Sequence, residues 1–222
     1  MDTLIIACKA LTDELNLVMA DTGCNYPILW IEPTLHEHPE LLRKRLQEEL
    51  DQVSVDIERV FLTFGFCGNA VLGIRAHDFL MILPRVEDCI TLLLGSAEKR
   101  KEITAEMETY FLTKGWLVYE ANIWSEYQKS IERMGEAKAK RVFKMLLGRY
   151  KRLGIIETGA FALEEFQEST KNIALEFNLN HQVISGTTQY LKKLLTGPWD
   201  DEFIIVNPGE EITLRHIYNL DG

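Results

Sequence analysis

Short apolar runs alternate with amphipathic segments over the first hundred residues of the chain. The runs cover residues 4–7, 28–31, 60–66 and 79–83. The segments between them repeat apolar residues at three- and four-residue spacing, as helices with one buried face do. This alternation is typical of βαβ units, so it predicts an α/β fold with a mostly parallel sheet and helices on both faces.

The alternation continues in the second half of the chain. It predicts strands over residues 110–112, 155–156 and 181–185, a last core strand over 203–206 and an edge strand over 212–214. A long helical stretch is predicted over residues 124–153, with weak points at Gly135 and Gly148. We therefore expect a single α/β domain over residues 1–222, with two Rossmann-like sub-lobes of about 1–105 and 106–222 and a cleft between them.

Composition and charge restrict the class of protein. With 222 residues, of which 46% are apolar, the chain can bury a substantial core. Its formal net charge of -10 argues against a nucleic-acid partner, which requires a basic face. No apolar run approaches the ~20 residues of a membrane span, and no secretory leader pattern is visible. We expect a cytoplasmic protein without a membrane partner, and its four cysteines are expected to be reduced.

Cysteine and histidine stand where the first four strands are expected to end. Cys8 closes the first apolar run and Cys67 the third, while His36 and Cys89 follow the second and fourth runs within a few residues. The carboxyl ends of parallel strands share one edge of a sheet, where open α/β folds bind ligands. Three thiols and one imidazole at this edge predict a Cys₃His metal site.

Alternatives to a zinc site remain open at this stage. Each cysteine taken singly is typical of a small buried apolar residue, and no short Cys-x-x-Cys spacing supports metal binding. Thiolate and imidazole ligands favour zinc, and an iron–sulfur cluster is the second candidate. Cys24 lies between a helix and the following strand, so we expect it at the opposite edge of the sheet, in a structural role.

Four further residues near this edge are candidate substrate-binding groups: Gly68, Asn69, Arg85 and Glu87. Gly68 and Asn69 belong to a turn after the third strand, where backbone N–H groups can approach a ligand. Arg85 follows the fourth strand and could pair with an anionic group. The alternatives are a tight turn for the first two residues, and for Arg85 a salt bridge with Glu87 or Asp88.

Several motifs of this chain resemble a family catalogued as domain of unknown function 1638. The motifs are Ile-Ile-Ala-Cys at 5–8, Thr-Leu-His at 34–36, Gly-Phe-Cys-Gly-Asn at 65–69 and Leu-Pro-Arg-Val-Glu-Asp-Cys-Ile at 83–90. The resemblance extends to Gly-Pro-Trp-Asp-Asp at 197–201, so it covers nearly the whole chain. The recurrent Ala-Cys, Leu-His, Cys-Gly and final Cys positions of that family correspond to Cys8, His36, Cys67 and Cys89.

The resemblance also implies a function. Many family members carry histidine before the last cysteine, where this chain has Glu87 and Asp88, so Glu87 would replace it as an oxygen ligand. Members often lie beside corrinoid-dependent methyltransferases for methylamines and related compounds. This implies a role in corrinoid-linked methyl-group metabolism, as a methyltransferase or an accessory, with a small-molecule or corrinoid-protein partner. The alternative is a non-catalytic binding protein with a structural zinc or an iron–sulfur cluster.

Overall fold

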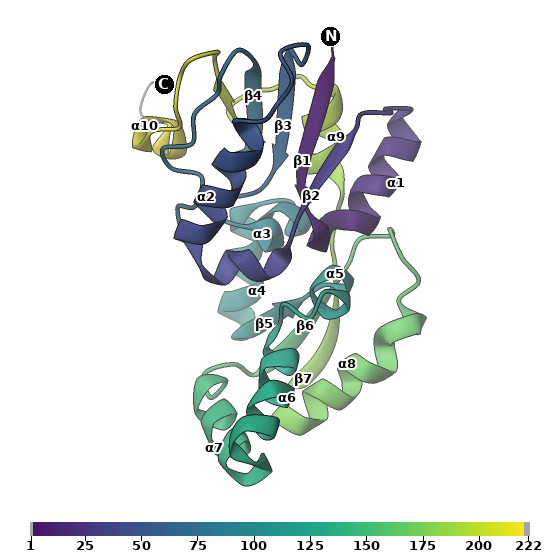
Figure 1. Cartoon of the computed structure of the whole chain (residues 1–222). Helices are drawn as coiled ribbons and strands as arrows, with labels where there is room; N and C mark the ends of the chain where they lie inside the picture. The colour runs from purple at the N-terminus through teal and green to yellow at the C-terminus, as the bar shows by residue number, and fades with distance from the viewer. Residues whose placement is uncertain (1, 220–222) are drawn as a thin grey trace.

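Two β-sheets, one above the other in Figure 1, organise the chain. The computed structural model describes residues 2–219. The first sheet has the strand order β2-β1-β3-β4-β8, in which only β8 is antiparallel to its neighbour. The second sheet has the order β5-β6-β7 and is parallel throughout. The strands are β1 (Thr3–Cys8), β2 (Ile28–Ile31), β3 (Arg59–Thr63), β4 (Leu80–Pro84), β5 (Thr109–Leu112), β6 (Arg152–Glu157), β7 (Asn180–Ser185) and β8 (Phe203–Val206).

Helices connect these strands and cover both sheets, which confirms the predicted α/β class. None of the helices within residues 2–219 is long and apolar enough to cross a membrane. The helices are η1 (Lys9–Leu11), α1 (Thr12–Thr22), η2 (Pro33–Glu37), α2 (Pro39–Leu50), α3 (Cys89–Leu94), α4 (Ala97–Glu106), α5 (Lys114–Val118), α6 (Ile123–Met134), α7 (Glu136–Leu146), α8 (Glu164–Phe177), α9 (Gln189–Thr196) and α10 (Leu214–Tyr218).

Both faces of the first sheet are buried, because successive side chains of each strand alternate between two apolar cores. Ile5 and Ala7 join a core with α1, α3 and α9, whereas Ile6 joins a core with α2 and α10 on the other face. The central strand β3 is apolar on both faces, as expected of a strand in the middle of a parallel sheet. This arrangement leaves the ends of the strands as the accessible parts of the sheet.

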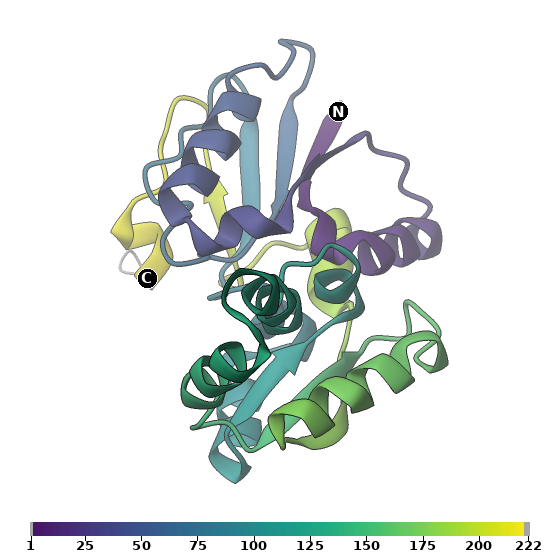
Figure 2. The ribbon, with the colours of Figure 1, turned by 60° about the horizontal axis from the view of Figure 1, so that its bottom comes forward.

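The second sheet forms the smaller lobe, with α6 and α8 on one face and α4 on the other (Figures 1 and 2). After β7 the chain returns to the first sheet, where β8 pairs with β4. The second lobe is therefore an insertion, and the carboxyl-terminal part of the predicted second sub-lobe packs with the first sheet instead. The pairing of β8 required a tertiary contact that no local pattern encodes.

Two predicted elements differ from the structure. The helical stretch over residues 124–153 is two helices, α6 and α7, because Gly135 adopts a positive φ of 82° between them. The last part of that stretch is strand β6, whose first residue is Arg152. The edge strand expected over residues 212–214 is wrong. Glu211 makes a single bridge with Arg75, and Leu214 begins α10 after Thr213 caps that helix.

A buried arginine joins α4 to the second sheet. Arg152 is 1% exposed, and its guanidinium donates to Thr109 Oγ1 at 2.7 Å, Gln182 Oε1 at 2.8 Å and the Ile103 carbonyl at 2.6 Å. Because Arg152→Met would leave the buried Thr109 hydroxyl and the partly buried Ile103 carbonyl without this donor, we expect it to lower the free energy of unfolding by about 3 kcal/mol. Urea denaturation measures the change.

The matched control for this substitution is Arg149→Met. Arg149 is exposed and lies over the ring of Tyr150, so its loss is expected to change the free energy of unfolding by less than about 0.5 kcal/mol. Equal effects of the two substitutions would contradict a structural role for the buried guanidinium.

Candidate functional site

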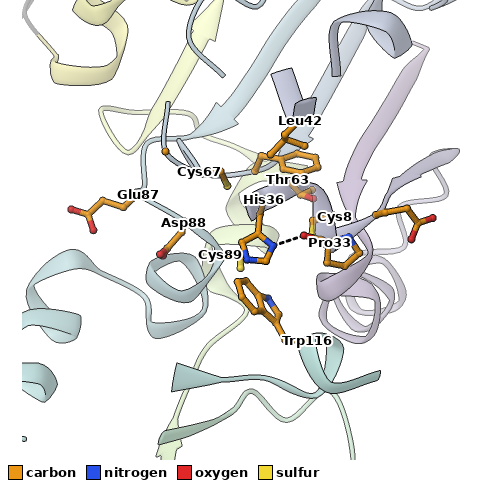
Figure 3. A pocket seen from close by; sticks show the side chains of 14 residues that line it. Cys8, Pro33, His36, Leu42, Thr63, Cys67, Glu87, Asp88, Cys89 and Trp116 are labelled. Carbon is orange, nitrogen blue, oxygen red and sulfur yellow. Dashed lines mark hydrogen bonds between the residues drawn. The ribbon is translucent and has the colours of Figure 1, made fainter. Parts of the chain in front are cut away.

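A cavity of about 310 Å³ lies at the carboxyl ends of β1, β2, β3 and β4 (Figure 3). This edge of the first sheet faces the second lobe (Figure 1). Cys8, His36, Cys67 and Cys89 all line it, as do Gly68 and Glu87. The structure thus brings the four predicted metal ligands to one edge of the sheet. Their sequence separations of up to 81 residues are bridged by the parallel topology, which directs the loops after these strands to the same edge.

Each of the four residues comes from a different local structure (Figure 3). Cys8 is the last residue of β1, and His36 belongs to the 3₁₀ helix η2 that follows β2. Strand β3 ends at Thr63 rather than continuing to residue 66 as predicted, so Cys67 lies in the loop beyond it. Cys89 is the first residue of α3.

The loop that carries Cys67 is fixed against the loop before α3. Phe66 N donates to the Val86 carbonyl and Cys67 N to the Glu87 carbonyl, each at 2.8 Å. A Cβ on Gly65 would lie 2.6 Å from the backbone nitrogen of Asp88, so the close approach requires glycine. Cys67 itself adopts a φ of 45°, an unusual conformation for a residue with a side chain. The two loops therefore hold Cys67 and Cys89 on one rigid support.

Trp116 of α5 completes the cavity from the second lobe. Its ring lies against the imidazole of His36, with 4.4 Å between ring centroids (Figure 3). Helix α5 contacts η1 so closely that a Cβ on Gly115 would lie 2.0 Å from the carbonyl oxygen of Ala10. The site is thus shared between the two lobes.

The orientation of His36 is set by its own helical turn. Its Nδ1 forms a hydrogen bond with the carbonyl oxygen of Pro33 (Figure 3). A carbonyl can only accept, so Nδ1 carries a proton and Nε2 is left as the nitrogen with a free lone pair. This arrangement is the usual one for a histidine that binds a metal through Nε2.

The three thiols of the cavity are protonated at neutral pH when no cation is present. Burial raises the pKa of Cys8 to about 11 and that of Cys67 to about 12. Burial also raises the pKa of Cys89 well above its ordinary value, and the neighbouring acidic groups Cys8 and Asp88 act in the same direction. A bound cation would reverse this balance, because metal coordination ionises thiols at neutral pH.

The side chains are not arranged around a preformed metal centre. Within residues 2–219, no three side chains of histidine, cysteine, aspartate or glutamate are grouped closely enough to hold a metal ion. The donor chemistry fits zinc, whereas tetrahedral coordination at 2.0–2.3 Å requires the thiols and His36 to turn towards one point in the cavity.

Two buried polar atoms of the cavity wall make no hydrogen bond with any of the described residues. They are Thr63 Oγ1 and Trp116 Nε1. The indole N–H lies near Cys89 and slightly opposes the rise in its pKa, but the contact lacks ordinary hydrogen-bond geometry. Buried polar groups are normally paired, so both atoms are suited to contact a bound molecule or water.

Asp88 connects the cavity to α4. Its side chain caps α3 by accepting from Thr91 N at 2.9 Å, and Arg100 donates to its two carboxylate oxygens at 2.7 and 2.8 Å. Arg100 also lies 3.5 Å from the Glu87 carboxylate. Arg100 belongs to the later helix α4 and is part of no motif, so nothing in the sequence marks it as a residue of the site.

Two predicted substrate-binding residues lie away from the cavity wall. The guanidinium of Arg85 donates to the backbone carbonyls of Asp201, Phe203 and His216, and makes neither of the salt bridges considered above. It therefore supports β8 and α10. Asn69 is exposed, and its carbonyl accepts from Arg43 at 2.9 Å. Gly68 and Glu87 remain as candidate substrate contacts.

Cys24 lies outside the cavity, in the loop between α1 and β2 at the opposite end of the strands. It is partly buried against the core on the α1 face of the first sheet. This position agrees with the structural role expected from the sequence, and it makes Cys24 the natural control for the three cavity thiols.

The fold and the cavity together define the class: a two-lobed α/β protein with a thiol-rich cavity at the carboxyl edge of its larger sheet. The profile of the family described as "Protein of unknown function (DUF1638)" matches residues 30–195, and the chain belongs to this family. The matched range includes His36, Cys67 and Cys89, while Cys8 precedes it. No curated protein and no solved structure matches the chain.

Proposed function

We propose that this protein binds one metal ion through Cys8, His36, Cys67 and Cys89, and that the site acts in corrinoid-linked methyl-group metabolism. The observation that carries the proposal is the convergence of three thiols and one imidazole, from four separate segments, on a single cavity. Zinc is the first candidate because it prefers thiolate and imidazole ligands, and an iron–sulfur cluster is the second.

The size of the cavity favours a reactive site over a closed structural one. A structural zinc is enclosed by four protein ligands, whereas a catalytic zinc keeps one position for substrate. A volume of about 310 Å³ is far larger than one ion needs and falls at the lower end of small-molecule sites, about 300–1000 Å³. A small thiol or methyl donor would fit in this space, and a substrate thiol would reach the ion by replacing His36, the ligand supplied by the segment after β2.

Methyl transfer suits this chemistry because the reaction needs a strong, polarisable nucleophile. A bound zinc ion would lower the pKa of a coordinated thiol and keep it ionised at neutral pH. The protein residues would hold the ion, and Trp116 and Thr63 would contact the substrate from the cavity wall. Glu87, 68% exposed at its side chain, would offer an oxygen ligand at the rim.

A corrinoid would take part only from outside the cavity. Its macrocycle exceeds a space of about 310 Å³, so a partner protein would carry it and present the methyl group at the opening. The protein itself is either the methyltransferase or an accessory to one, and these two roles share the same metal requirement.

Elemental analysis of protein purified without oxygen tests the metal. We expect about one zinc ion per chain. Iron with acid-labile sulfide would instead support the cluster. Protein that is folded, free of both metals and unable to take up zinc would contradict the proposal.

A chelator separates the reactive site from the structural alternative. Because the two cores of the first sheet consist mainly of aliphatic and aromatic side chains that bind no metal, we expect chelation to leave the circular dichroism spectrum unchanged and to lower the melting temperature only slightly. Unfolding on chelation would show a closed structural site, as in the non-catalytic alternative.

A further inference from the structure

Three successive residues in the first turn of α1 contact the second lobe. Each uses its side chain, and each meets a different part of that lobe. The pairs are Thr12 Oγ1 with Tyr119 Oη at 3.4 Å, Asp13 Oδ2 with Lys114 Nζ at 3.1 Å, and Glu14 Oε1 with Thr158 Oγ1 at 3.0 Å.

Glu14 differs from its two neighbours in burial. The residue is 2% exposed, whereas the side chains of Asp13 and Lys114 are 34% and 23% exposed. The Thr158 hydroxyl, which follows β6, donates to its carboxyl group. Burial between two lobes disfavours the ionised form of a carboxyl group relative to its protonated form, because the charge loses its hydration.

This row of contacts is joined to the cavity through the backbone. Cys8 directly precedes η1, and η1 directly precedes Thr12. On the other side of the interface, Gly115 packs on Ala10 and is followed by Trp116, which lines the cavity. Movement of the lobes at α1 would therefore move Trp116 relative to Cys8.

The chain crosses between the lobes at two adjacent points. The first crossing is at Gly95, between α3 and α4, and the second is at Thr187, between β7 and α9. The two are joined by a hydrogen bond from Thr187 N to the carbonyl of Leu93 at 2.7 Å. Gly95 has a φ of 93° and lies so close to Thr187 that a Cβ would be 2.9 Å from its methyl group. Paired crossings of this kind form a natural hinge, because few residues absorb the rotation.

We propose that the second lobe closes and opens over the cavity, and that Glu14 is a proton-dependent latch that holds it closed. With the carboxyl group protonated, the interface of α1 with α5 and Thr158 stays packed. When the group ionises, a charge is left in a buried interface, and opening returns it to water. This inference is independent of the metal and of the methyl-transfer reaction.

The charged groups around Glu14 do not cancel the effect of burial, which favours the protonated form of its carboxyl group. The pKa of Glu14 is raised from 4.5 to about 7: burial is the largest cause and Asp13 acts in the same direction, while a hydrogen bond from its own backbone, Thr158 and Lys114 act in the opposite direction. From α9, which also packs on α1, Lys193 pairs instead with Asp200 and Glu202. The Glu157 carboxylate accepts from Gly159 N at 2.6 Å.

The sign of the pH dependence follows from the difference between the pKa of Glu14 in the closed state and its pKa in the open state. The closed state holds its proton up to about pH 7, whereas an open, hydrated carboxyl group loses it near 4.5. Closure is therefore fully favoured when the pH is below the pKa of Glu14 in the open state, and it weakens as the pH rises towards the pKa of Glu14 in the closed state. Between pH 5.5 and pH 8.5 the ratio of closed to open protein is expected to fall roughly 30-fold.

Amide hydrogen exchange at these two pH values tests the latch, with small-angle scattering as a second readout of lobe separation. After correction for intrinsic rates, amides of α5 should exchange up to about 30-fold faster at pH 8.5 than at pH 5.5 in the native protein. Glu14→Gln, which stays neutral, should abolish this difference. Glu168→Gln, an exposed change on α8, should preserve it.

Thr158→Val provides a second test should Glu14→Gln not fold. Loss of the hydroxyl donor to the carboxylate should raise the closed-state pKa of Glu14, so that the fall in the ratio of closed to open protein continues to higher pH and becomes larger in total. Equal α5 exchange at both pH values in the native protein, or the same pH dependence in Glu14→Gln, would overturn the latch.

Discussion

Cys67→Ser is expected to reduce the metal content of the protein from about one ion per chain to below about 0.1. Cys67 follows β3, which lies between β1, the strand that ends at Cys8, and β4, the strand that precedes Cys89, and its loop is fixed to the α3 side by two backbone hydrogen bonds. Serine keeps the size and the left-handed backbone of this residue but does not supply a thiolate. The measurement is metal analysis by mass spectrometry after anaerobic purification.

Cys24→Ser is the matched control, because it makes the same chemical change outside the cavity. It should leave the metal content unchanged. Cys89→Ser should behave like Cys67→Ser, since both thiols line the cavity. Equal metal content in Cys67→Ser and Cys24→Ser would remove the central claim of the proposed function.

Gly115→Ala is expected to separate the two lobes and to lower the stability of the protein by about 3 kcal/mol. The new Cβ would lie 2.0 Å from the Ala10 carbonyl oxygen and 2.6 Å from its carbonyl carbon, which are backbone atoms of η1 that cannot rotate away. Relief requires α5 to move off η1, and Trp116 would leave the cavity with it. Calorimetry should resolve two unfolding transitions in place of one.

Gly148→Ala tests whether any added methyl group has this effect. Its Cβ would meet the Lys144 carbonyl oxygen at 3.1 Å, a contact that a shift of a few tenths of an ångström relieves. We expect a change of less than about 1 kcal/mol and a single transition. A normal calorimetric profile for Gly115→Ala would show that the lobes do not depend on this contact.

Local sequence patterns predicted some residues of the candidate site and not others. Cys8, His36 and Cys67 were found because each follows an apolar run, and parallel strands bring such positions to one edge. Trp116 and Thr63 carry no comparable signal. Thr63 reads as part of a strand, and Trp116 reaches the cavity only because Gly115 packs on Ala10, more than a hundred residues away in sequence.

Local sequence patterns also cannot show where a long side chain finds its partners, which is why Arg85 was predicted at the site but lies elsewhere. Arg85 follows the fourth strand, so its sequence position predicts a place at the ligand edge. Its guanidinium instead meets three carbonyls from β8, α10 and the loop before β8, all contributed by the last 22 residues of the chain. A long side chain can point to either side of a strand end, and only its partners decide which.

The sequence by itself determined the α/β class, the positions of the first four strands along the chain and the chemical identity of the donors at their ends. Periodicity and strand-end position are local properties, and the parallel βαβ connection translates them into one shared edge. The tertiary structure alone decided that the second sheet is an insertion, that β8 returns to β4, and that Trp116 closes the cavity. These features depend on contacts between residues far apart in sequence, whose energies no local pattern contains.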